Sequence, residues 1–203
     1  MSKTRLENLT DGVFAIVMTL LVIEIKVPDV HGPLAEALQG LAPLFVSYFL
    51  SFAVLSAFWL SHHGIFHFMI RTINRQFIQL NILYLSFVAL IPFSAHLLGS
   101  HPHDQVAVMW YGANIALVIV ALFIMLTYAI RCKEIENERI SKRTLWQAGI
   151  RNGLTFGMAV LGMFVSYYSI STAIFLYLIP AIFNAIPGSL NFLEWLVGMR
   201  IPE

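Results

Sequence analysis

Long apolar stretches separated by short polar connections run the length of this chain. Each stretch holds about 20 residues, which is the length an α-helix needs to cross the roughly 30 Å hydrocarbon core of a bilayer. The pattern predicts six spans, at residues 9–27, 42–61, 77–98, 106–130, 150–169 and 172–197. No segment alternates in the manner of a β-strand. We therefore expect an all-α membrane protein that forms a single domain over residues 1–203.

Composition supports a membrane protein. Hydrophobic residues make up 59% of the chain and charged residues 11%, with a mean hydropathy of +0.78. Ordinary soluble domains carry about 25% charged residues, so the composition excludes a soluble enzyme and a disordered chain. The net charge of +1 offers no basic surface for a nucleic acid. A single cysteine, Cys132, excludes an internal disulfide framework and a cysteine-built zinc site.

The positions of the basic residues predict the orientation of the spans. With both termini in the cytosol, 11 of the 12 Lys and Arg residues fall on the cytosolic side and Lys26 alone falls outside. The strongly charged segment 131–147 is then a cytosolic helical extension or loop. No A-x-A-like cleavage site follows the first apolar stretch, so we expect that stretch to remain as a helix over about 9–27.

Polar residues inside the spans concentrate on the first helix. At about 100° per residue, Ile16, Thr19, Leu20 and Ile23 share one stripe, while Asp11 points roughly 220° away from Ile16. Ionisable residues inside a membrane are candidates for function. The stripe itself also fits ordinary contact with lipid or with a helical core.

The end of the second span provides candidate partners for Asp11. Trp59 and His62 lie there, and antiparallel packing of the two helices brings His62 to the depth of Asp11. An indole N–H and an imidazole N–H are both able to donate to a carboxylate. We interpret these residues as a structural network that holds the first helix in place.

The polar and apolar residues of the first two spans resemble the signature of a known family, the transmembrane protein 175 family of potassium channels. The resemblance is carried by Arg5, Leu9-Thr10-Asp11, Ile16, Thr19-Leu20-Leu21, Pro28 and the Trp59-x-x-His62 pattern. Leu9 and Thr10 stand where the family usually has Phe and Ser. Members of the family form their pore from the first helices, and prokaryotic members with a single six-span unit form tetramers.

The resemblance implies a homotetrameric potassium channel in the inner membrane of a prokaryote, with passive K⁺ flux. It assigns the pore gate to Ile16, Leu20 and Ile23 and the selectivity layer to Thr19. It also implies that the pore helix is held by a network of five residues: Arg5, Thr10, Asp11, Trp59 and His62.

Physical reasoning about the stripe is consistent with that implication. The chain has no TVGYG-like loop of filter carbonyls, and a narrow ring of apolar side chains gates a pore by expelling water. A ring of Thr19 hydroxyls would replace part of the water that an ion sheds, which predicts modest selectivity for K⁺ over Na⁺. Apart from the permeant ion we expect no cofactor, no metal site and no catalytic residue.

A small secondary transporter is the alternative function. Pro180, Asn184, Pro187-Gly188 and Asn191 interrupt the last span, and broken helices mark the binding sites of transporters. Transporters also tend to carry internal repeats, and the first three spans do not visibly repeat in the last three.

Two further patterns favour structural roles. His62, His63 and His67 have the spacing of a metal box, but the other histidines are scattered toward the outer side, so we expect membrane-edge histidines. Glycines recur every four residues at positions 149, 153 and 157, a spacing that lets membrane helices approach closely. No G-x-S-x-G motif is present, and we do not expect an enzyme.

Overall fold

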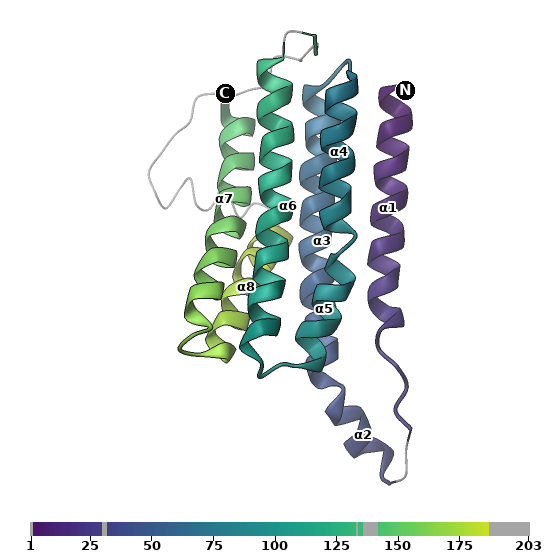
Figure 1. Cartoon of the computed structure of the whole chain (residues 1–203), viewed down its shortest axis with the longest axis vertical. Coiled ribbons are helices and arrows are strands. Elements are labelled where there is room, and N and C mark those ends of the chain that lie inside the picture. Colours follow the sequence, from purple (N-terminus) through teal and green to yellow (C-terminus); the bar gives the residue numbers. More distant parts are fainter. Residues whose placement is uncertain (1, 30–31, 133, 136–141, 187–203) are drawn as a thin grey trace.

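A computed structural model describes residues 2–29, 32–132, 134–135 and 142–186 of the chain, and these ranges are helical apart from their connections. The long helices stand side by side as one bundle (Figure 1). The helices are α1 (Lys3–Ile23), α2 (Leu34–Gly40), α3 (Ala42–Met69), α4 (Arg75–Val88), α5 (Ile91–Ser100), α6 (Gln105–Arg131), α7 (Lys142–Val165) and α8 (Ile170–Ala185).

Short polar side chains form the N-caps of several of these helices. Asn74 accepts a hydrogen bond from the backbone N–H of Phe77 at 2.9 Å, and Asp104 accepts one from Val106 at 2.7 Å. Ser2 and Ser169 cap α1 and α8 in the same way. Each cap satisfies a backbone donor that the first helical turn leaves without a partner.

The third predicted span is divided into α4 and α5. Pro92 has no N–H to give to the carbonyl four residues earlier, which belongs to Val88, the last residue of α4. Its ring also clashes with that carbonyl, so the helix breaks and restarts at Ile91. The segment Arg75–Ser100 nevertheless remains long and apolar enough to cross a bilayer as one unit of 26 residues.

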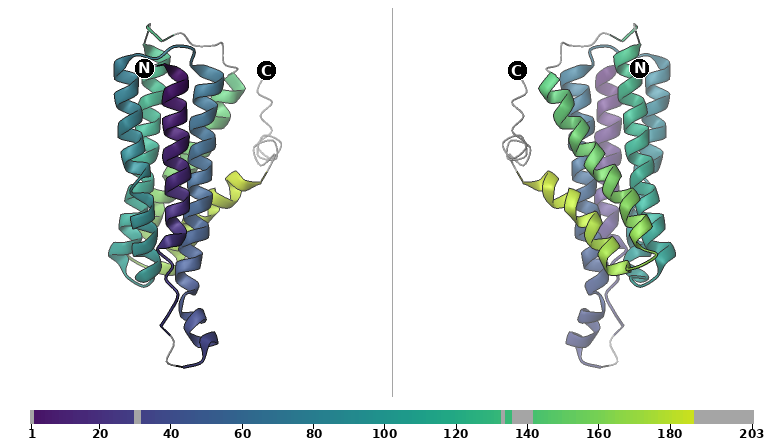
Figure 2. Two further views of the ribbon diagram at one scale, coloured as in Figure 1. Left: turned by 90° about the vertical axis from the view of Figure 1, so that its right-hand side faces the viewer. Right: turned by 90° about the vertical axis from the view of Figure 1, so that its left-hand side faces the viewer.

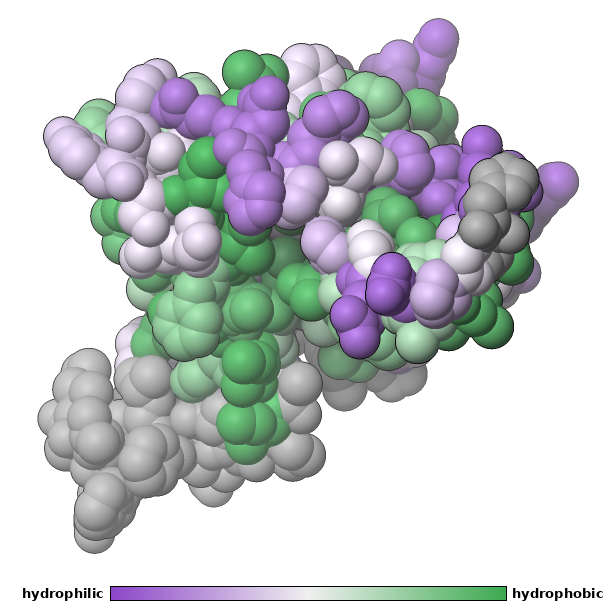
Figure 3. Space-filling model, turned by 90° about the horizontal axis from the view of Figure 1, so that it is seen from below, coloured by the Kyte–Doolittle hydropathy of each residue, from purple (hydrophilic) through white to green (hydrophobic). Residues whose placement is uncertain are grey.

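Successive long helices run in opposite directions. The N-terminus, the 70–74 connection and the start of α7 lie at the upper end of the bundle in Figure 1, where Lys3, Arg71 and Arg131 also fall. The connections after α1, α5 and α7 lie at the lower end. Seen from below, hydrophilic residues collect along one side of that end, with hydrophobic residues exposed beside them (Figure 3).

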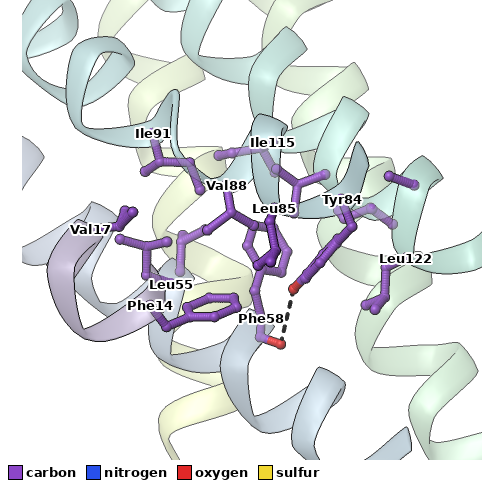
Figure 4. Close-up of a cluster of buried hydrophobic side chains, with 14 of the residues drawn as sticks. Phe14, Val17, Leu55, Phe58, Tyr84, Leu85, Val88, Ile91, Ile115 and Leu122 are labelled. Atoms are coloured by element: carbon purple, nitrogen blue, oxygen red, sulfur yellow. Dashed lines mark hydrogen bonds between the residues drawn. The ribbon is translucent and has the colours of Figure 1, made fainter. Parts of the chain in front are cut away.

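The core runs along the middle of the bundle between α1, α3, α4, α5 and α6. Phe14 of α1 packs at 6.2 Å, centroid to centroid, from the ring of Tyr84 on α4. The Tyr84 hydroxyl donates to the backbone carbonyl of Phe58 on α3 at 3.3 Å (Figure 4). Val17, Leu55, Val88 and Ile115 complete this cluster, and each is at most 3% exposed.

The structure has five helical segments long and apolar enough to span a membrane, counted over the described residues. The sixth predicted span, 172–197, corresponds to α8, whose described part ends at Ala185, and the rest of that prediction lies outside the described residues. α8 begins directly after a short turn following α7, as expected, and leans away from the bundle as it rises (Figure 2). It continues as a helix through Pro180.

Candidate functional site

The first helix has two unlike faces. α1 lies at one edge of the bundle (Figure 1) and packs against α3, α4 and α5. Its buried stripe repeats at i, i+4, i+8, i+11 and i+15 and consists of Leu6, Thr10, Phe14, Val17 and Leu21. That spacing places all five side chains on one side of a helix.

The opposite face of α1 is uncovered within the subunit. Ile16 is 60% exposed, Leu20 41% and Ile23 66%, and Thr19 is exposed as well. By helical geometry Thr19 lies almost directly opposite the middle of the buried stripe, with Ile16 and Ile23 about 60° and about 40° away from it on the same side. Leu20 lies nearer the flank, in agreement with its lower exposure. The four residues of the predicted gate and selectivity layer therefore share the unpartnered face.

The Thr19 hydroxyl is held by its own helix. It donates toward the backbone carbonyls of Ile16 at 2.8 Å and Ala15 at 3.0 Å. A hydroxyl has one proton and two lone pairs, so this arrangement uses the proton and leaves the lone pairs of the oxygen directed away from the helix. The exposed face consequently offers oxygen as an acceptor, which is the chemistry that binds a cation.

Asp11 forms a pair with Trp59 at the edge of this face. The Trp59 indole Nε1–H donates to Asp11 Oδ1 at 2.8 Å, which joins α1 to α3. Both residues line a groove of about 550 Å³ between the two helices, together with Met18, Phe52 and Ser56. Asp11 is exposed in the single subunit. The pair therefore fixes the side of α1 that borders the uncovered face.

A second, fully buried network holds α1 from behind. His62 Nε2–H donates to Asn81 Oδ1 at 2.7 Å, and Asn81 Nδ2–H donates to Thr10 Oγ1 at 3.0 Å. The Thr10 hydroxyl in turn donates a hydrogen bond to the backbone carbonyl of Leu6 at 3.0 Å. Because the Asn81 amide uses its N–H toward Thr10, its oxygen faces His62, and this requires a proton on His62 Nε2. The chain of donors links α3, α4 and α1 in one direction.

Aromatic rings clamp His62 in this position. The imidazole stacks between Phe66, with ring centroids 4.4 Å apart, and Tyr84, at 5.4 Å. His62 is 3% exposed, and Asn81 and Thr10 are both 0% exposed. A polar group buried to this degree is costly without a partner, so the three side chains stabilise one specific placement of α1.

In the structure, the residues of the predicted network fall into two separate sets of hydrogen bonds. Asp11 bonds Trp59 but His62 bonds Asn81, so the expectation that His62 donates to Asp11 is wrong: the imidazole points to α4 instead. Arg5 lies apart, since its exposed side chain has no hydrogen bond or ion pair with any described residue. Sequence reasoning missed Asn81, although an amide inside the apolar run 77–98, which otherwise holds only Gln79 of that kind, was a usable signal.

Two of the three histidines with metal-box spacing have other partners in the structure. His62 serves Asn81, and His63 stacks on the Trp59 ring at 5.4 Å. The side chain of His67 lies outside the described residues. No group of three or more His, Cys, Asp or Glu side chains with the geometry of a metal site occurs within the part of the chain that the structure describes.

Together, the bundle and its apolar exterior define an α-helical membrane protein of several spans, with one face of α1 uncovered within the subunit. A sequence profile of the endosomal/lysosomal potassium channel TMEM175 matches residues 5–92. A potassium channel of Chryseobacterium sp. (strain P1-3) is 30% identical over 187 residues, covering 92% of this chain and 94% of the relative. The chain belongs to the TMEM175 family.

Two further relatives extend the comparison. The endosomal/lysosomal proton channel TMEM175 of Homo sapiens is 39% identical over 104 residues, covering 46% of this chain and 20% of the human protein. The crystal structure of a lysosomal potassium-selective channel TMEM175 homolog from Chamaesiphon minutus superposes with a TM-score of 0.77 at 28% identity. That match covers 90% of this chain and 96% of the homolog.

Proposed function

We propose that this protein is a potassium channel in which four copies surround a central axis through their α1 helices. The observation that carries the proposal is the uncovered face of α1, where Ile16, Thr19 and Ile23 project from a helix whose other side is fully packed. One such helix cannot enclose a pore, so conduction requires several copies. The bacterial relatives are named as potassium channels, and this supports K⁺ as the permeant ion.

In this assembly the gate is a stack of apolar rings. Along the helix axis, Ile16 and Ile23 lie about one helical turn before and after Thr19. Leu20 lies at the edge of the same exposed face. Apolar rings at a narrow point expel water, which opposes ions that hold their hydration shell tightly. The Thr19 oxygens offer lone pairs between the rings, where an ion has lost part of its water. K⁺ sheds water more readily than Na⁺, so K⁺ passes preferentially.

The orientation follows from the charges. The end of the bundle that carries Lys3, Arg71 and Arg131 faces the cytosol by the positive-inside rule. Both termini then lie in the cytosol, with six spans in the cell membrane of a prokaryote. The Asp11–Trp59 pair and the Thr10–Asn81–His62 network sit in the cytosolic half of the channel.

Flux through purified protein in liposomes tests the proposed function. We expect passive K⁺ efflux down its gradient that exceeds Na⁺ efflux measured under matched conditions. Empty liposomes and liposomes with heat-denatured protein serve as controls. Saturable exchange that requires a second solute would instead support a transporter and would contradict a channel.

A further inference from the structure

The outer end of α1 is buried less deeply than the rest of the helix. Its last buried residue is Leu21, and the helix ends at Ile23, whose side chain is 66% exposed. The last turn contains no basic residue, although a positive charge near this end of a helix stabilises it through the macrodipole. The placement of Ile23 therefore depends on what the residues at the end of α1 contact.

Glu24, the C-cap of α1, contacts a histidine of the neighbouring helix. Its Oε2 atom lies 3.6 Å from Nδ1 of His96 on α5. At about 100° per residue, Glu24 lies within about 40° of the middle of the buried stripe, whereas Ile23 points about 140° away from that middle. The contact therefore joins the packed side of α1 to the bundle, while Ile23 faces away from it.

The His96 ring is hydrogen-bonded at one nitrogen only. Nε2 lies 3.3 Å from Ser100 Oγ, within hydrogen-bond distance. Nδ1 is shielded from solvent and has no hydrogen-bond partner among the described residues, because Glu24 Oε2 lies beyond the length of a hydrogen bond. A ring nitrogen without a hydrogen bond therefore faces a carboxylate.

The charge of the imidazole decides how strong this contact is. A neutral ring has one N–H and one lone pair, so a lone pair at Nδ1 repels the carboxylate and an N–H at this distance attracts it weakly. A protonated ring has an N–H at both nitrogens and a positive charge, and it attracts Glu24 as an ion pair. Histidine side chains change charge between about pH 5 and 8, where carboxylates are generally ionised. The link between α1 and α5 is consequently stronger in acid.

Few other charges lie near this pair. Residues 42–61 of α3 and 105–130 of α6 contain no Asp, Glu, Lys, Arg or His. Tyrosine side chains, the other titratable groups on these two stretches, stay neutral below about pH 8. The remaining charged or titratable groups that the structure describes at this end are Lys26, Asp29, Glu36, His101, His103 and Asp104. Within the described part of the chain, Glu24 and His96 form an ion pair with each other and with no third residue.

We propose that Glu24 and His96 position the outer ring of the gate: when His96 is protonated, the pair draws the last turn of α1 toward α5 and so moves Ile23 away from the pore axis. This role rests on the proposed function, in which the α1 helices surround the axis and α5 stands behind α1 on the side of the bundle (Figure 1). When His96 is neutral, Glu24 has no opposing charge at the helix end, the ring of Ile23 narrows, and fewer ions pass.

Potassium flux at two pH values tests the pair in the assembled channel. Because the two side chains are 38% and 45% exposed, we expect flux at about pH 5.5 to exceed flux at about pH 8 by about twofold to fivefold, the upper range for an exposed ion pair. His96→Gln and Glu24→Gln each remove one charge and should give the lower flux at both pH values. His96→Arg keeps a positive charge and should give the higher flux at both. His101→Gln, the matched control, should keep the pH dependence of the wild type.

A spin label beyond the end of α1 tests the pair without relying on conduction. Cys132, the single cysteine, is replaced by Ser, and a nitroxide is attached to Val27→Cys, where the native side chain is 87% exposed. We expect electron paramagnetic resonance to report slower motion of the label at about pH 5.5 than at about pH 8. The same label in a Glu24→Gln background should move equally at both pH values.

The two measurements separate the positioning role from the proposed function. Label motion that follows pH in a protein without potassium flux would support the link between α1 and α5 and contradict the channel. Potassium flux with the same value at both pH values in the wild type would overturn the positioning role and leave the channel intact. A pH dependence of flux or of label motion that persists in His96→Gln would also overturn the positioning role.

Discussion

Single side chains on α1 have different surroundings although their chemistry is alike. Val17 is 3% exposed in the core, whereas its neighbour Ile16 is 60% exposed. Adjacent residues on a helix point about 100° apart, so one residue packs into the core while the next faces away from the subunit. This contrast makes adjacent substitutions an internal control for the pore face.

Replacing Ile16 by Asn is expected to increase K⁺ flux and to reduce the preference for K⁺ over Na⁺. The amide places polar groups at one level of every α1 helix, so water is no longer expelled there and Na⁺ passes with more of its hydration shell. Liposome flux of both ions measures the effect.

The matched control is Val17→Asn. Burying an amide at this core position without a partner costs stability, so we expect less folded protein and no rise in flux per folded channel. A Val17→Asn channel that opens while Ile16→Asn does not would show that the pore face has been assigned to the wrong side of α1.

In the proposed channel, Thr19 acts through its oxygen. Thr19→Val keeps the shape of the side chain and removes the oxygen lone pairs, so K⁺ preference should fall while total flux is maintained. Thr19→Ser keeps the oxygen and should retain most of the preference. The ratio of K⁺ to Na⁺ flux is the measurement, and an unchanged ratio in Thr19→Val would remove Thr19 from the selectivity layer.

Asn81 is predicted to be the central residue of the buried network. Asn81→Leu leaves the His62 N–H without an acceptor and Thr10 without a donor, so we expect a loss of about 1–3 kcal/mol in stability. Thr10→Val leaves one Asn81 N–H without an acceptor. The expected loss of stability is smaller, about 1 kcal/mol, as is usual for hydrogen bonds between membrane helices. Thermal unfolding of the purified variants compares the two losses, and equal stability of Asn81→Leu and wild type would contradict the network.

At the scale of helices, the spacing of small residues does not reveal which of them are packed. Gly149, Gly153 and Gly157 have the regular four-residue spacing, yet a Cβ at any of them meets no atom within 4 Å. Gly112 and Gly162 show no such regularity, but together they form the slot for the ring of Tyr177. The Tyr177 hydroxyl donates to the Val108 carbonyl at 3.1 Å and so ties α8 to α6.

Gly162→Ala is therefore expected to loosen the docking of α8. The added methyl group would lie 2.8 Å from Tyr177 Cζ, inside a well-packed core, and overpacking of this kind typically costs about 1–3 kcal/mol. Gly157→Ala on the same helix has open space and should be neutral or slightly stabilising. The midpoints of thermal unfolding distinguish the two variants. A Gly157→Ala variant that is the less stable of the pair would contradict the packing described for α7 and α8.

At the scale of the whole molecule, the uncovered side of α1 predicts the assembly. Four chains of 22.9 kDa give a particle of about 92 kDa before bound detergent is counted. We expect light scattering in mild detergent to report this mass. A stable monomer or dimer under conditions that preserve flux would contradict a four-fold pore.

Hydropathy and charge in the chain were enough to predict an all-α membrane protein, the approximate span positions and the amphipathic division of α1. These properties depend on bilayer thickness and on helical periodicity, which act on residues near in sequence. The break between α4 and α5 also has a local cause in Pro92, although the apolar run 77–98 reads as one span.

Contacts between distant residues needed the folded chain. Asn81 reaches Thr10 across 71 positions, and Trp59 reaches Asp11 across 48. The sequence identified Trp59 and His62 as partners of α1, but the direction of each side chain depends on helix rotation and on which helix lies behind it. His62 therefore turned toward α4 rather than Asp11. In the same way, whether a glycine packs or lies open depends on the neighbouring helix, because packing is a property of pairs of surfaces and not of one segment.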